Sequence, residues 1–106
     1  MMKTAMIIVD HLVDNLLKSG YSLNLWDGDS GYLFDEWSTD KQALMSELAS
    51  MDLDHLYGRK EDKRGGGVQL VYENGIDVIV DYTIADKEFE VICDEAIKFA
   101  NTLEDK

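Results

Sequence analysis

The spacing of apolar residues changes twice along this chain, and that change limits the fold more than any other feature. Near both ends, apolar residues recur at intervals of three and four, as amphipathic helices require. The first such stripe contains Ala5, Val9, Leu12, Val13, Leu16 and Leu17. The last contains Phe89, Ile92, Cys93, Ala96, Ala100 and Leu103. We therefore expect helices over residues 4–18 and 86–103, with a β-rich region between them.

Alternating apolar residues predict the first strands of that region. Residues 21–26 place Tyr21, Leu23 and Leu25 on one face. A turn rich in Gly and Asp follows, and residues 32–37 are then expected to return as a second strand.

A second helix and a further strand follow these two. Thr39 and Gln42 have the spacing of a capping box, which predicts a helix that begins there. A short strand is expected near residues 55–59.

The last hairpin, residues 68–82, is predicted from burial. A three-residue loop at Glu73-Asn74-Gly75, with Gly75 left-handed, places most apolar residues on one face and Asp77 and Asp81 on the other. The fold class expected is α+β, with a single antiparallel sheet of about five strands and helices packed mainly on one face. The predicted order is α-β-β-α-β-β-β-α, in one domain over residues 1–106.

The charge of the chain limits its partners. It carries 22 Asp and Glu against 10 Lys and Arg, a formal net charge of −12. Such a chain repels nucleic acid and anionic membranes and attracts basic surfaces. We therefore expect a non-enzymatic module that binds a protein with a basic surface, without direct nucleic-acid or membrane contact. The candidate partner-binding residues are Asp27, Asp29, Asp35, Glu36, Asp77 and Asp81.

Nucleic-acid mimicry is an alternative form of that function. A folded chain of this size exposes roughly 6,000 Å², or about 500 Å² per net charge. Duplex DNA carries about one charge per 100 Å² of its surface. Mimicry therefore requires the acids to gather on one side. Whether Trp26 and Trp37 belong to the core or to an interface stays open.

Four of the ten cations lie in one short segment: Arg59, Lys60, Lys63 and Arg64. Three glycines follow, Gly65 to Gly67, so a mobile hairpin connection is expected. A phosphate-binding loop would lead into a helix, whereas this segment leads into a strand. The alternative function is contact with an acidic partner, including a second copy of the chain in a structural homodimer.

An enzyme is the other alternative, and no catalytic pattern supports it. A small metal- or ligand-dependent site would have to use His11, His55 and nearby carboxylates, but their spacing matches no known motif. We expect no catalytic residue, no metal and no cofactor. The single Cys93 lies on an apolar helix face, where an inert thiol is usual. It fits a reducing compartment, and the apolar run from Ala5 to Val9 is too short for a signal or membrane segment, so a cytoplasmic location is expected.

Three stretches of the sequence carry a resemblance. They are Tyr21 to Gly28, Ser38 to Lys41, and Leu70 to Thr83 with its Tyr72-Glu73-Asn74-Gly75 turn. In these stretches the chain is similar to small acidic phage- and prophage-associated proteins of unknown function. The matching residues mark strands, caps and a turn, so the resemblance implies a shared fold and no activity. It also favours an inhibitor that engages a host enzyme.

Overall fold

The fold is known from a computed structural model, which describes residues 2–26, 31–34, 36–48, 53–61, 63–84 and 86–104. Three α-helices, four strands and one 3₁₀ helix follow one another in these ranges. They are α1 (Met2–Lys18), β1 (Ser22–Trp26), α2 (Lys41–Glu47), β2 (Leu53–Lys60), β3 (Lys63–Val71), η1 (Tyr72–Asp77), β4 (Ile79–Ile84) and α3 (Lys87–Glu104). The expected α+β class is confirmed.

The strands form one antiparallel sheet in the order β1-β2-β3-β4. The expected fifth strand at residues 32–37 is wrong. Leu23 and Ser38 exchange two backbone hydrogen bonds of 2.8 Å, but the described residues of this segment form isolated bridges and no continuous ladder. The fully buried Asn24 side chain takes the place of ladder hydrogen bonds to Phe34. Its Oδ1 accepts from Phe34 N–H at 3.0 Å, and its Nδ2 donates to Phe34 C=O at 2.9 Å.

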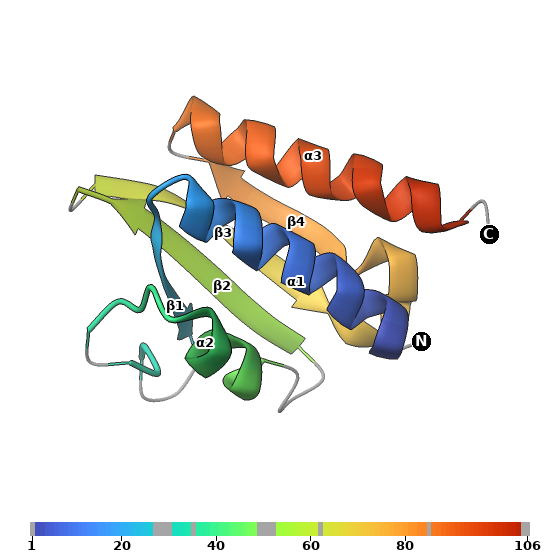
Figure 1. The fold of residues 1–106 in the computed structure, drawn as a ribbon, viewed down its shortest axis with the longest axis horizontal. Coiled ribbons are helices and arrows are strands. Elements are labelled where there is room, and N and C mark those ends of the chain that lie inside the picture. The colour runs from blue at the N-terminus through green and yellow to red at the C-terminus, as the bar shows by residue number, and fades with distance from the viewer. Residues whose placement is uncertain are drawn as a thin grey trace.

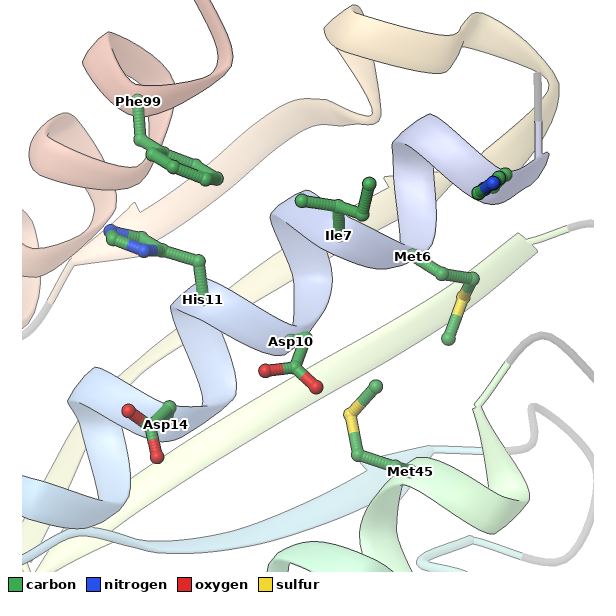
Figure 2. Close-up of a pocket in the computed structure, with 8 residues that line it drawn as sticks. Met6, Ile7, Asp10, His11, Asp14, Met45 and Phe99 are labelled. Carbon is green, nitrogen blue, oxygen red and sulfur yellow. The ribbon is translucent and has the colours of Figure 1, made fainter. Parts of the chain in front are cut away.

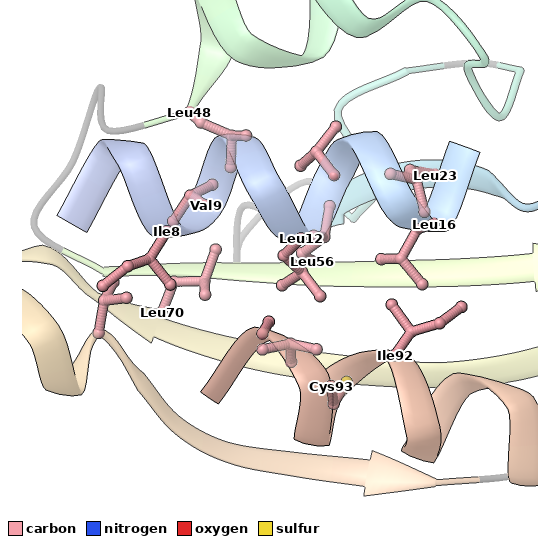
Figure 3. Close-up of a cluster of buried hydrophobic side chains, with 14 of the residues drawn as sticks. Ile8, Val9, Leu12, Leu16, Leu23, Leu48, Leu56, Leu70, Ile92 and Cys93 are labelled. Atoms are coloured by element: carbon pink, nitrogen blue, oxygen red, sulfur yellow. The ribbon is translucent and has the colours of Figure 1, made fainter. Parts of the chain in front are cut away.

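The helices α1 and α3 lie side by side over one face of the sheet, and α2 lies beside α1 (Figure 1). Between these layers lies the core, in which α1 and α3 bury the stripes expected from the sequence (Figure 3). Leu56 of β2 and Leu70 of β3 are fully buried beneath them. The expectation that helices cover mainly one face is confirmed.

Helix ends follow from local chemistry, with one correction. Gly20 has φ of 95°, a left-handed conformation that suits glycine after a helix C-terminus. The cap of α2, however, is Asp40 and not Thr39. The Asp40 carboxylate accepts from the backbone N–H groups of Gln42 and Ala43 at 3.0 and 3.3 Å.

The last hairpin differs from the predicted three-residue loop. Residues 72–77 form η1, in which Gly75 has the expected positive φ of 63°. The predicted loop would pair Val68 with Val80, but Val68 pairs with Tyr82 and Gln69 with Asp81. The two residues of each observed pair still share a face, as predicted. A bulge then shifts the register so that Leu70 faces Ile79. As a result Val80, expected in the core, is 48% exposed.

The basic, glycine-rich segment is not the mobile connection that its composition suggested. Residues up to Lys60 belong to β2, β3 begins at Lys63, and all three glycines are buried. A Cβ at Gly65, Gly66 or Gly67 would lie within 2.6 Å of the ring of Tyr21, Phe89 or Tyr57, respectively. The glycines are therefore required because aromatic rings lie directly on this strand.

None of the described helices is both long and apolar enough to cross a membrane.

Candidate functional site

A groove of about 590 Å³ runs along the outer side of α1. The residues of α1 that line it repeat at helical spacing on the side opposite the buried stripe. They are Lys3, Met6, Ile7, Asp10, His11 and Asp14. From Lys3 to Asp14 this stripe is about 16 Å long, because a helix rises about 1.5 Å per residue. Met45 of α2 and Phe99 of α3 complete the lining (Figure 2).

Apolar side chains from three helices meet in this groove. Figure 2 shows Met6 and Met45 pointing toward each other from α1 and α2. Ile7 lies between Met6 and the Phe99 side and is 44% exposed. Methionine side chains are flexible and adapt to the shape of what they contact. The groove therefore offers an adaptable apolar surface that the described residues leave open.

Ion pairs form one rim of the groove. Lys41 Nζ lies 2.8 Å from Asp10 Oδ1 and 3.6 Å from Asp14 Oδ1, and Lys18 Nζ lies 2.9 Å from Asp14 Oδ2. The hydrogen bond from Lys18 lowers the pKa of Asp14, and the hydrogen bond to Asp10 raises the pKa of Lys41. Exposed pairs of this kind contribute little stability, because solvent screens them. Another cation can therefore take the place of Lys41 at small cost.

His11 forms the other rim with two residues of α3. Its ring stacks on Phe99 with centroids 4.0 Å apart and a 5° angle between the planes. Its Nε2 lies 2.7 Å from Glu95 Oε2 and donates to that carboxylate. Figure 2 shows the His11 and Phe99 rings facing each other at the groove. His11 is therefore only partly exposed, because Phe99 covers one face of its ring.

A second candidate surface lies on the sheet face that α1 and α3 leave open. Its central feature is an aromatic cluster, which we define as Trp26, Tyr32, Trp37 and Tyr57. Tyr32 contacts the other three rings, with centroid distances of 5.2, 5.0 and 5.8 Å. Trp26 and Tyr32 remain 39% and 41% exposed. The open question about the two Trp residues is thus answered for Trp26, which lies at the surface.

Two arginines extend the aromatic cluster. The Arg59 guanidinium lies 4.8 Å from the Trp37 ring centroid, and that of Arg64 lies 5.5 Å from the Tyr57 centroid. The register between β2 and β3 places Arg59 directly opposite Arg64. The hairpin pattern predicted Asp77 and Asp81 on the face opposite the apolar residues. The described part of the open face, however, also carries these two arginines.

A smaller cavity of about 220 Å³ lies on the same face, toward β4. Its polar lining comes from the row formed by His55, Gln69 and Asp81, with Thr83 and the Tyr57 ring beside it. The Asp81 carboxylate accepts from the Tyr82 backbone N–H at 2.9 Å.

The predicted acidic residues do not form one patch within the described ranges. Glu36, Asp77 and Asp81 are all exposed. Glu36 belongs to the segment beside β1, whereas Asp81 lies in β4, at the opposite edge of the sheet. Asp27, Asp29 and Asp35 lie outside the described residues, so their part of the prediction stays untested.

The two histidines cannot act together as the enzyme alternative required. His11 lies on the helical layer, whereas His55 lies on the open face of the sheet, since it alternates with the buried Leu56. Among the described residues, no three His, Cys, Asp or Glu side chains gather as a metal site would need. Cys93 is fully buried, and burial, helped by the Asp94 charge, raises the pKa of its thiol to about 12.

Sequence reasoning missed both surfaces. Met6 and Ile7 do fall outside the regular buried stripe of the first helix, which was the available signal for the groove. The aromatic cluster gave no such signal, because its rings come from separate segments that only the folded chain brings together.

Comparisons with known proteins add no further information. The chain matches no protein-family model, no curated protein and no solved structure. The proposals below therefore rest on the geometry and the charge of the chain.

Proposed function

We propose that this chain is a protein-binding module that takes a basic amphipathic helix of a partner into the groove along α1. The observation that carries this proposal is the groove itself, which is about three helical turns long. Its apolar floor comes from three helices, and charged residues of α1 lie along it; the apolar residues are Met6, Ile7, Met45 and Phe99. An amphipathic helix binds such grooves through apolar residues spaced three and four apart. No catalytic role is proposed.

Charge supports a basic occupant. Asp10, Asp14 and Glu95 lie at the groove, and their present partners Lys41, Lys18 and His11 are held in exposed pairs. Lysines or arginines of the bound helix can replace these partners at small cost. The net charge of −12 attracts a basic helix over a longer range and speeds its association at low salt.

The exposed acids of the sequence-based prediction keep a role in this proposal. Glu36, Asp77 and Asp81, with the sequence neighbours Asp27, Asp29 and Asp35, add to the field that steers a basic partner. Inhibition of a nucleic-acid-binding enzyme of a phage host is one form that such binding would take. Mimicry of DNA has weaker support, because Arg59 and Arg64 interrupt the acidic character of the open sheet face.

A synthetic peptide tests the groove directly. The probe is a labelled Leu/Lys amphipathic helix of about three to four turns, and its Leu/Glu counterpart is the control; binding is measured by fluorescence anisotropy. Ile7→Glu should weaken Leu/Lys binding about tenfold, which is about 1.4 kcal/mol, because it places a charge on the apolar lining. Val91→Glu is the matched control, since Val91 is 55% exposed on α3 and does not line the groove.

Equal binding of the Leu/Glu peptide, or equal losses with Ile7→Glu and Val91→Glu, would contradict the proposal. Binding of the Leu/Lys peptide should also weaken as salt rises, because screening removes the long-range attraction.

A further inference from the structure

The hairpin end of β2 and β3 places like charges opposite each other. Arg59 faces Arg64 and Lys60 faces Lys63 in the strand register. Directly opposed like charges destabilise an antiparallel pair. Glu88 compensates Lys60 at 2.8 Å, but within the described ranges no carboxylate forms an ion pair with Arg59 or Arg64. The chain has more than twice as many acids as bases, yet none of the described carboxylates neutralises Arg59 and Arg64. An anionic group of a binding partner would relieve their repulsion.

Both guanidinium groups are already held in place. Arg59 lies over Trp37 and Arg64 over Tyr57, at 4.8 and 5.5 Å. A guanidinium that stacks on a ring keeps the N–H groups at its edge available for carboxylates. Little side-chain entropy remains to be lost when such a group binds.

The same face carries the complementary charge. Asp81 is exposed and borders the cavity of about 220 Å³, and no described cation pairs with its carboxylate. Its register partner Gln69 is five residues from Arg64 along β3, about 16 Å at the usual strand rise. Tyr57 of β2 and Gly67 of β3 pair with each other about midway between Arg64 and Gln69.

We propose that the open face of the sheet binds a second copy of this chain in a two-fold dimer. An axis near the Tyr57–Gly67 row brings Arg59 and Arg64 of each copy onto Asp81 of the other. Each contact then occurs twice, as a two-fold interface requires. The cavity beside Asp81 receives an arginine side chain, and the exposed rings of the aromatic cluster are covered. This surface is separate from the groove, so the inference does not depend on the proposed function.

The dimensions of the molecule permit an interface of this kind. The molecule measures 39 × 28 × 22 Å, so the side normal to the shortest axis spans 39 by 28 Å. A standard stable interface removes about 800 Å² per partner from water. Two copies that each carry a net charge of −12 repel each other at low salt. Dimerisation should therefore be measured at physiological ionic strength, where charges farther apart than about 8 Å are largely screened.

Sedimentation equilibrium of the full chain tests the dimer. The wild type should approach twice the chain mass of 12.0 kDa as its concentration rises. The variants R59E/R64E and D81R should each raise the dissociation constant about tenfold or more, because like charges then meet across the interface. An equimolar mixture of these two variants should dimerise again, because each supplies the charge that the other needs. Circular dichroism checks that both variants fold.

The control is I7E, which alters the groove and should leave the dimer unchanged. A wild type that stays monomeric at all concentrations overturns the inference, as does a dimer that R59E/R64E leaves intact. A mixture of R59E/R64E and D81R that stays monomeric refutes the proposed pairing of Arg59 and Arg64 with Asp81.

Discussion

Gly66 lies in β3 beneath the ring of Phe89, with the Thr83 carbonyl beside it. A Cβ at this position would lie 2.6 Å from both the Phe89 Cδ1 and the Thr83 oxygen. The ring can shift, but the carbonyl belongs to the neighbouring strand and cannot move without breaking the ladder. Close approach of helix α3 to the sheet therefore depends on the absence of a side chain at this residue.

Gly66→Ala should lower the free energy of unfolding by about 2–3 kcal/mol, the upper part of the range for overpacked sites. Gly58→Ala is the comparison, because a Cβ there meets only side-chain atoms of Phe89 and Leu23, at 2.9 and 3.2 Å. Its cost should be smaller, since side chains relax more easily than backbone. Urea unfolding measures both variants. An unaffected Gly66→Ala protein would show that the strand accommodates the extra methyl group. Equal losses in the two variants would show that the Thr83 carbonyl is no harder to displace than the side chains around Gly58.

At the scale of elements, the short helix α2 depends on Asp40, the residue that caps its N-terminus. With only seven residues, α2 has little stability of its own. The Asp40 carboxylate satisfies two backbone N–H groups that would otherwise lack partners. The helix in turn carries Met45, one wall of the groove, and buries Leu44 in the core.

Asp40→Ala should destabilise the protein by about 1 kcal/mol, the usual cost of losing an N-cap. Thr39→Ala should change stability by less than about 0.5 kcal/mol, as exposed positions normally do. Thermal unfolding of the two variants decides between them. If Thr39→Ala lost more stability than Asp40→Ala, Thr39 would be the N-cap, as the predicted capping box with Gln42 requires.

At the scale of the whole molecule, charge opposes the compact state. The net charge of −12 produces self-repulsion, whereas the described ion pairs are few and exposed. The urea midpoint should therefore rise when sodium chloride is added, because screening weakens the repulsion more than it weakens these pairs.

The variant E36Q/D77N should reproduce part of this salt effect. It removes two exposed acids that form no ion pair with any described residue. Its midpoint should be slightly higher than that of the wild type at low salt and equal at high salt. A midpoint that falls with added salt would instead show that local pairs outweigh the net charge.

Periodicity identified the two long helices, the first strand and the stripes that enter the core. Periodicity succeeds for these elements because each buries one face, and the residues of that face recur at a regular spacing within the element itself. It failed at residues 32–37, which Asn24 holds through its side chain. It also failed at the last hairpin, where residues 72–77 form η1 and a bulge between Gln69 and Leu70 shifts the register of β3 against β4.

The sequence by itself thus determined the α+β class, the core-facing residues of α1 and α3, and the excess of acids. Only the tertiary structure decided what lies on the two open surfaces. The groove exists because Met6 and Ile7 of α1 lie between α2 and α3 without being covered by them. The aromatic cluster exists because β1, β2 and the segment before α2 meet on one face. Contacts between segments distant in the chain follow from how layers pack, and spacing along the sequence does not record them.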